Sequence, residues 1–424
     1  MSPRNIVAFV LTAAACAPKP PAPAPAPAAA GASSAFAHAL AQADSRVRAA
    51  VAREQVPGAV LLVARDGRIV LERAYGYAQL YDYGMRRLER PVPMRTTDLF
   101  DLASVTKVMA TTLAVMRLVD RGAVDVDAPV YRYLPEFRGA HLDSITVRHL
   151  LTHSAGLVQW QPLYYHAHTP RETYDLIRSM PLGWGVGEGR HYSDLGFMLL
   201  GYLVERVSGR PLDAFVRDEL YRPLGLRHTT YLPRAQGFHE FAATEHGNPY
   251  ERHMVYDTAF GYRYRGDPTA WDGWRRYTLV GEVDDGNAWY ANGGVAGHAG
   301  LFSTAADLHI LLEVLLNDGS WGGRRYLSPE VVHTFLTRDR YGHGLGWMMP
   351  AELPEGGFSH TGFTGTYVMG VPASHLAVVL LTNRQNVGTD PAGYYPDPGP
   401  LQRAVSRVLA DAAAADAGTR TGAP

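Results

Sequence analysis

Leu102-Ala103-Ser104-Val105-Thr106-Lys107 is the stretch around which we expect the chain to fold, because it opens a long apolar run from Val108 to Val119. A helix that starts near Asp101 would place Ser104 and Lys107 on one face, since side chains three positions apart are neighbours on a helix. The first-turn amides of a helix have no partner within it, so the Ser104 N–H could donate to an oxyanion. The helix dipole and burial would both lower the pKa of Lys107. The spacing therefore predicts a nucleophilic serine with its base one turn away, although Ser-x-x-Lys alone also suits a helix start with a solvated lysine.

Length and composition bound the classes of protein to consider. The chain has 424 residues, a formal net charge of −1 and 46% apolar residues, which is ordinary for a globular protein with a sizeable core. The charge balance gives no electrostatic case for binding nucleic acid or an anionic membrane surface. The single cysteine excludes an internal disulfide, and no cysteine and histidine spacing resembles a zinc site. We therefore expect no nucleic-acid partner.

The first residues have the pattern of an export signal. Arg4 is followed by an apolar run from Ile6 to Leu11, which is too short to span a bilayer as a mature helix. Cys16 lies where a bacterial lipoprotein signal places its lipidated residue, although Ala13 stands where leucine is usual. A simple cleaved signal with a chance cysteine is the alternative. Residues 17–35, rich in alanine and proline, predict a flexible linker, so we expect an exported protein, periplasmic or anchored to the membrane through Cys16.

Strand patterns occur at both ends of the chain, with helical patterns between them. Alternating and β-branched segments predict strands at 59–64, 69–75, 98–102, 344–349, 358–362, 367–371 and 376–381. Helical spacing and capping residues predict helices at 36–51, 145–156, 195–208, 305–317 and 401–412. The fold class expected is α/β (α+β), with one antiparallel sheet built from both chain ends and flanked by helices. We expect an α/β part at 36–107 and 301–415, a mainly helical subdomain at 108–300, and a disordered tail at 416–424.

Two further clusters supply chemistry that Ser104 would need. Tyr192-Ser193-Asp194 lies in a glycine-rich loop before a helix, and a phenol there can relay a proton if the cation of Lys107 lowers its pKa. His360-Thr361-Gly362 lies on a predicted strand, where the glycine permits close approach to a substrate. The next residue, Phe363, could supply a second oxyanion N–H, and His360 a donor toward a substrate carboxylate or carbonyl. Taken singly, the tyrosine also suits packing at a helix entrance, and the histidine a half-exposed strand.

The order and spacing of these clusters resemble a known family. Its members carry Ser-x-x-Lys, Tyr-x-Asn and Lys-Thr-Gly or His-x-Gly motifs, which stand here at Ser104–Lys107, Tyr192–Asp194 and His360–Gly362. The chain is similar to the serine β-lactamase and penicillin-binding-protein superfamily, nearest the branch of class C β-lactamases, D-alanyl-D-alanine carboxypeptidases and related esterases. The resemblance extends over roughly residues 40–410 and includes family-like sequence segments at Thr146–Leu157 and Gly293–Leu308.

The resemblance implies a mechanism and a choice of functions. Ser104 would form an acyl-enzyme with a small acyl substrate, Lys107 and Tyr192 would share the general-base and general-acid work, and the Ser104 and Phe363 amides would hold the oxyanion, with no cofactor. We expect an exported hydrolase, first a D-alanyl-D-alanine carboxypeptidase or related cell-wall peptidase, then a carboxylesterase, then a β-lactamase. A non-catalytic protein that binds penicillin or the cell wall is the alternative from a different class.

Two residues depart from the family pattern. Asp194 replaces an asparagine, and an ionised carboxylate beside Lys107 should raise the pKa of that amine and shift the proton-acceptor role to Tyr192. His360 replaces a lysine and is mostly neutral near pH 7, so its grip on a carboxylate should be weak. We therefore expect modest recognition of β-lactams.

Several other polar residues have mainly structural explanations. His153 lies on a predicted helix, and His298 lies among glycines where it would order a loop. The loop acids could line the mouth of a cleft, but we expect them to form a solvated surface cluster; they are Glu282, Asp284 and Asp285.

Overall fold

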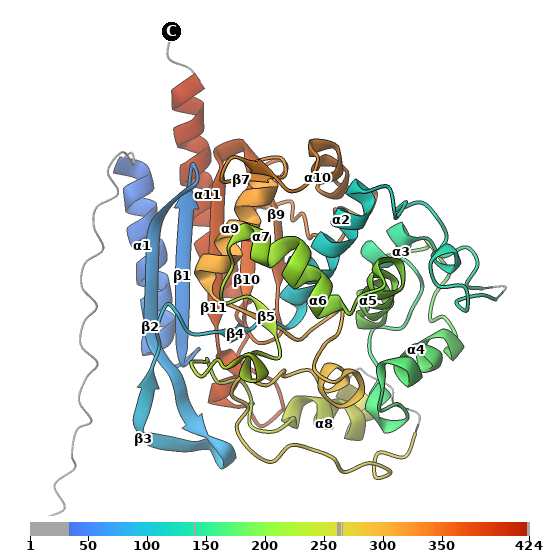
Figure 1. Ribbon diagram of the computed structural model, residues 1–424. Coiled ribbons are helices and arrows are strands. Elements are labelled where there is room, and N and C mark those ends of the chain that lie inside the picture. Colours follow the sequence, from blue (N-terminus) through green and yellow to red (C-terminus); the bar gives the residue numbers. More distant parts are fainter. Residues whose placement is uncertain (1–33, 140, 261–263, 265, 422–424) are drawn as a thin grey trace, which may run out of the picture.

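The protein is built on one six-stranded antiparallel sheet, with two helices on one face and a helical region on the other (Figure 1). The computed structural model describes residues 34–139, 141–260, 264 and 266–421. The predicted signal sequence, Cys16 and residues 17–33 of the predicted linker lie outside the described residues.

The sheet joins the two ends of the chain, as predicted. Its strand order is β3-β2-β1-β11-β10-β9, and every neighbouring pair is antiparallel. The strands are β1 Gly58–Arg65, β2 Arg68–Asp82, β3 Arg86–Pro93, β9 Phe358–Thr361, β10 Tyr367–Val371 and β11 Leu376–Thr382. The turn from β1 to β2 has positive φ at Asp66 (50°) and Gly67 (73°), which is what a tight hairpin of the predicted kind requires. Every residue of β1 is buried, because β1 is a central strand covered on both faces.

Helices α1 (Ser34–Ala52) and α11 (Gly399–Thr421) cover one face of the sheet, and α9 (Ala305–Leu316) packs on the other. The remaining helices are α2 Leu113–Asp120, α3 Val147–Leu151, α4 Pro170–Ser179, α5 Asp194–Ser208, α6 Leu212–Val216, α7 Arg222–Leu224, α8 Pro249–Tyr256 and α10 Pro329–Phe335. Short strands complete the fold: β4 Phe100–Asp101, β5 Thr230–Tyr231 and β6 Leu301–Ser303 form one small sheet, and β7 Ser320–Trp321 pairs with β8 Arg324–Arg325. Across residues 34–421, excluding the undescribed positions, no helix combines the length and the hydropathy needed to cross a membrane.

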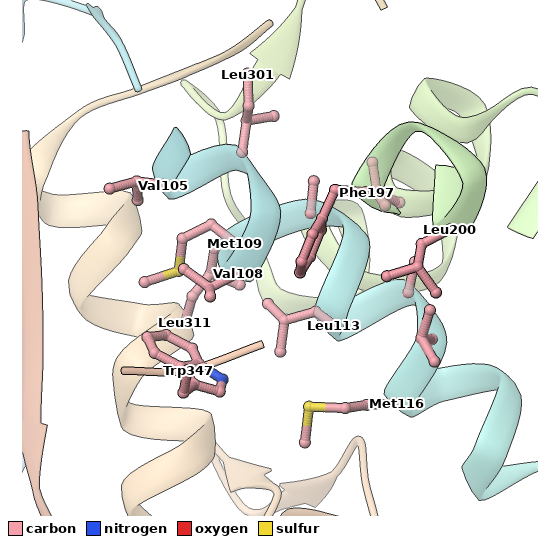
Figure 2. Packing of buried hydrophobic residues seen from close by; sticks show 14 of the residues in the cluster. Val105, Val108, Met109, Leu113, Met116, Phe197, Leu200, Leu301, Leu311 and Trp347 are labelled. Carbon is pink, nitrogen blue, oxygen red and sulfur yellow. The ribbon is translucent and has the colours of Figure 1, made fainter. Parts of the chain in front are cut away.

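The apolar run after Lys107 anchors the centre of the molecule. It forms a π-helical segment, Lys107–Thr112, that continues into α2. Figure 2 shows this segment between α9, which contributes Leu311, and α5, which contributes Phe197 and Leu200. Packing on both sides fixes the turn that carries Ser104 relative to the sheet and to the helical region.

Several sequence predictions about the elements are wrong. Residues 344–349 form no strand; they are a loop that touches β9 through a single bridge between Met348 and Ser359. The predicted helix at 145–156 ends as α3 at Leu151, because the chain turns at His153, whose φ is 56°. Strand β3 was not predicted, since its residues are mostly exposed and include two prolines.

The C-terminal tail is helical rather than disordered as far as Thr421. Residues 412–415 are all alanine, the residue with the highest helix propensity, which favours continuation of the helix. Asp416 forms a buried ion pair with Arg65 of β1 at 2.7 Å, so the helix is also tied to the sheet.

Candidate active site

Ser104 lies in a tight 3₁₀ turn, Ala103–Val105, rather than in the first turn of an α-helix. The preceding residue, Ala103, has a φ of 44°, a left-handed conformation that is strained for a residue with a Cβ. Its amide donates to Asp101 Oδ1 at 2.9 Å, and the hydroxyl of Thr366 donates to the carbonyl of Leu102 at 2.9 Å. These hydrogen bonds hold the strained bend and present the serine to a cavity.

Lys107 is fully buried and contacts three oxygens. Its Nζ lies 2.8 Å from Ser104 Oγ, 3.2 Å from the carbonyl oxygen of His298 and 2.6 Å from Asp194 Oδ1. Burial lowers the pKa of Lys107, but Asp194 and Tyr192 together outweigh burial and raise that pKa above its ordinary value. The amine is therefore an ammonium that donates to the serine. This direction agrees with the prediction from Asp194 and is opposite to the lowered pKa predicted from burial and the helix dipole.

Tyr192 lies against the same ammonium, with its ring centroid 4.9 Å from Lys107 Nζ. The loop that carries it is fixed by Ser193, which caps α5 by accepting from the Gly196 amide. His153 packs against the tyrosine ring, with the ring centroids 4.4 Å apart, and accepts a hydrogen bond from the Ser193 amide at 3.0 Å. His153 thus has the structural role that we expected.

The pKa of Tyr192 moves in the direction opposite to our expectation. Burial raises this pKa more than the neighbouring Lys107 and Ser104 lower it, so the net shift is upward. The phenol is neutral at rest, and Lys107 and Ser104 lie close enough to influence its pKa. It can pass a proton on only as a relay.

The end of strand β9 runs directly beside the serine turn. A Cβ on Gly362 would lie 2.4 Å from the carbonyl oxygen of Leu102, so only glycine permits this approach. Thr361, Gly362 and Phe363 line the same cavity as Ser104. In the described part of the chain, the backbone amides of Ser104 and Phe363 have no hydrogen-bond acceptor, as a pair of oxyanion donors requires.

His360 does not have the predicted role of a donor to substrate. Its Nδ1 donates to the carbonyl of Thr361 at 2.8 Å, so Nε2 carries no proton and has no partner among the described residues. Burial, with Lys107 nearby, lowers the pKa of His360 to about 3, and the ring is absent from the described residues that line the cavity. The strand alternates its side chains, so Thr361 faces the cavity and His360 lies buried beside Tyr192, with ring centroids 6.4 Å apart.

One cavity of about 610 Å³ collects the predicted residues from three distant parts of the chain. It is lined by Ser104, Tyr192, Asp194, Thr361, Gly362 and Phe363. Lys107 lies beneath this lining, in contact with Ser104 and Asp194. Among the described residues, no group of three or more histidine, cysteine or acidic side chains is arranged to hold a metal ion.

The acids at 284 and 285 belong to the cavity wall, so the expectation of a solvated surface cluster is wrong for them. Asp284 accepts from Gln385 Nε2 at 3.0 Å, and its amide donates to Asp101 Oδ2 at 2.6 Å. Burial raises the pKa of Asp284 to about 6 and that of Asp101 to about 7. Their partners come from remote segments, which explains why the local sequence gave no indication of burial.

His298 and Asp285 have a role that the sequence analysis missed. His298 Nε2 lies 2.8 Å from Asp285 Oδ1, and the backbone carbonyl of His298 accepts from Lys107. Asp285 therefore fixes the residue that orients the ammonium of Lys107. The glycine-rich stretch from Gly293 to Gly300 indicated an irregular backbone. It did not indicate that the carbonyl oxygen of His298 would accept a hydrogen bond from Lys107.

Comparisons with known proteins agree with this geometry. The family model described as Beta-lactamase matches residues 43–395. The chain is 38% identical over 362 residues to the N-acetylmuramyl-L-alanine amidase of Bacillus subtilis (strain 168), covering 78% of each chain. It is 35% identical over 357 residues to a Salmonella agona protein named as a D-alanyl-D-alanine carboxypeptidase, covering 77% of this chain and 79% of the relative.

Solved structures show the same fold. EstCE1, a hydrolase with promiscuous acyltransferase activity, superposes with a TM-score of 0.65 at 24% identity, covering 90% of this chain and 100% of the other. The octameric penicillin-binding protein homologue from Pyrococcus abyssi superposes with a TM-score of 0.63 at 22% identity, covering 87% of this chain and 77% of the other. With the family model and the relatives above, these findings place the chain in the Beta-lactamase family, whose members are serine hydrolases.

Proposed function

We propose that the protein is an exported acyl-serine hydrolase that cleaves amide bonds in cell-wall peptides, most closely in the manner of a D-alanyl-D-alanine carboxypeptidase. The observation that carries the proposal is that Ser104 Oγ lies 2.8 Å from the buried ammonium of Lys107. The same cavity is lined by Tyr192 and by Ser104 and Phe363, whose backbone amides have no hydrogen-bond acceptor among the described residues. The names of the two relatives, an amidase and a carboxypeptidase, both describe hydrolysis of an amide bond.

In the proposed acylation step, Ser104 Oγ bonds to the scissile carbonyl carbon and the carbonyl oxygen becomes an oxyanion. The Ser104 and Phe363 amides donate to that oxyanion. The permanent charge of Lys107 stabilises the negative charge that develops on the attacking oxygen. Because the lysine is already protonated, the serine proton passes to the Tyr192 oxygen while the phenol proton moves to the leaving nitrogen. The amine then departs and leaves an ester on Ser104.

Deacylation uses the same groups in reverse. Water bonds to the ester carbon and gives its proton to the Tyr192 oxygen, and the phenol proton returns to Ser104 Oγ. The ester bond breaks and releases the acid product. Lys107, held by Asp194 and the His298 carbonyl, keeps its charge throughout both steps.

The relay predicts a specific defect for Tyr192→Phe. We expect kcat/KM for an amide substrate to fall by about 10²- to 10⁴-fold, the usual contribution of proton transfer. A p-nitrophenyl ester has a leaving group that needs no proton, so its acylation should fall less. Burst and steady-state kinetics on both substrates measure the difference, and the unchanged ring should keep the melting temperature close to that of the wild type. Nearly full acylation of the amide substrate would contradict the relay.

A product analysis identifies the bond that is cleaved. The purified protein is incubated with a peptide ending in D-Ala-D-Ala and, separately, with a muramyl peptide, and the products are identified by mass spectrometry beside a Ser104→Ala control. Release of terminal D-alanine supports the carboxypeptidase proposal. Release of the peptide from the muramyl group favours the second candidate, suggested by the 38% identity to an amidase of that name. Rapid turnover of p-nitrophenyl esters with neither peptide cleaved would replace the proposal with the carboxylesterase alternative.

The sequence pattern around Cys16 supports export with a lipid anchor. We expect the full-length protein to fractionate with membranes when expressed in a Gram-negative host, and Cys16→Ser to fractionate with the periplasmic contents. Metabolic labelling with an alkyne fatty acid should mark the wild type and leave Cys16→Ser unmarked. Equal labelling of both proteins, or of neither, would contradict lipidation at this position.

A further inference from the structure

We propose that Arg190 binds a carboxylate of the substrate beside the scissile bond, so that anion recognition lies in the loop before α5 rather than at His360. This inference rests on the proposed hydrolase function and adds the charge of the substrate to it. A neutral, buried imidazole at position 360 supplies no positive charge to the cavity. Arg190 supplies one.

Arg190 lines the cavity and lies on the same loop as Tyr192, two residues before it. Its Cζ lies 5.8 Å from the centroid of the tyrosine ring, while Lys107 Nζ lies 4.9 Å from the same centroid. Two cations therefore lie near the tyrosine ring. Because that phenol must reach the leaving nitrogen in the proposed relay, Arg190 lies close to the bond that is cleaved.

Arg190 has no anionic partner in the described part of the chain. Its Nε is buried and makes no hydrogen bond, and its guanidinium forms no ion pair with the described acids, although Asp339 is near enough to influence it. Asp194, the acid beside Tyr192, is already paired with Lys107. A half-buried guanidinium without a partner is costly, and its fixed donor geometry fits a carboxylate.

The other arginines in the cavity differ in ways that provide a control. Arg384 already donates to two backbone carbonyls, with its Nε 2.7 Å from Phe363 O and its Nη1 2.8 Å from Pro396 O. Arg403 lines the cavity but is exposed, on helix α11. Arg403→Gln therefore removes the same charge from the same cavity at a solvated position.

Matched substrates separate the anion effect from the chemistry. Benzoyl-glycyl-mercaptoacetate and its methyl ester differ only in a carboxylate on the leaving group. Mono-p-nitrophenyl adipate and its methyl ester differ only in a carboxylate on the acyl group. These thioesters and activated esters need acyl-serine chemistry but no cell-wall specificity, so the test does not depend on which wall bond is cleaved.

For Arg190→Gln we expect kcat/KM to fall about 10- to 100-fold for the carboxylate-bearing substrate of one pair. A loss of this size corresponds to the free energy of one charge-assisted hydrogen bond. The matching methyl ester should change less than threefold. Arg190→Lys should recover part of the loss, because it restores the charge without the planar fork, and Arg403→Gln should leave the ratio of acid to ester unchanged. The pair that responds identifies the side of the scissile bond on which the carboxylate lies.

An equal loss for acid and ester in both pairs would overturn the inference while leaving the hydrolase proposal intact. The same selective loss in Arg403→Gln would also overturn it, since general electrostatics would then explain the effect. Wild-type protein that turns over none of the four substrates would overturn the hydrolase proposal itself. If Arg190→Gln does not fold, as judged by its melting temperature, Arg190→Lys alone decides, and an unchanged acid-to-ester ratio in it counts against the inference.

Discussion

Replacing Ser104 by alanine is expected to lower kcat/KM by about 10⁴- to 10⁶-fold, the range found when an acylated nucleophile is removed. The two described groups closest to Ser104 cannot readily replace it as the nucleophile, because Tyr192 is a buried neutral phenol and Lys107 is a paired ammonium. Steady-state kinetics with a p-nitrophenyl ester and with the cleaved peptide measure the loss.

A matched control makes the Ser104→Ala result specific. Ser328 caps the distant helix α10 by accepting from the Val331 amide, so Ser328→Ala should cost about 1 kcal/mol of stability and leave kcat/KM unchanged. Ser104→Ala with activity within tenfold of the wild type would contradict Ser104 as the nucleophile.

Replacing Lys107 by methionine is expected to damage both activity and stability. We expect kcat/KM to fall by at least about 10²-fold, because the serine loses its charged donor and the relay loses its neighbouring cation. The free energy of unfolding should fall by about 3 kcal/mol, because Asp194 would be left near the cavity floor without its cation. Chemical denaturation measures the stability, and ester turnover measures the activity.

A double variant separates the two effects. In Lys107→Met with Asp194→Asn, the uncompensated carboxylate is gone, so most of the lost stability should return while activity stays low. A double variant no more stable than Lys107→Met would show that the 2.6 Å ion pair contributes little to the fold. Wild-type activity in either variant would exclude Lys107 from the mechanism.

Much of the fold follows from local signals that tertiary structure does not reverse. The Asp66-Gly67 turn forms the predicted hairpin because both residues adopt positive φ. Segments 367–371 and 376–381 were predicted as strands from their β-branched composition, and they form the antiparallel pair β10 and β11. The hydroxyl and amine of Ser-x-x-Lys meet because a spacing of three residues suffices in a 3₁₀ turn as well as in an α-helix.

The errors at the site share one cause, which is that contacts between distant segments decide which side chains are buried and which way they point. The alternation of β9 fixes only that His360 and Thr361 point to opposite faces, and the packing of β9 on the serine turn selects which of them reaches the cavity. Asp284 is buried because Gln385 and Asp101 supply its partners. The role of Arg190 could not be predicted from the sequence, because only the fold places it at the cavity wall with its Nε lacking a hydrogen bond.

Trapping the acyl-enzyme tests the central claim most directly. The wild type is quenched in acid during reaction with a fluorescent penicillin or a slow ester, digested with trypsin, and analysed by tandem mass spectrometry. The account predicts one acyl adduct on the peptide Thr96–Lys107, placed on Ser104 by fragmentation and absent from Ser104→Ala. An adduct on another residue, or the same adduct in Ser104→Ala, would contradict it.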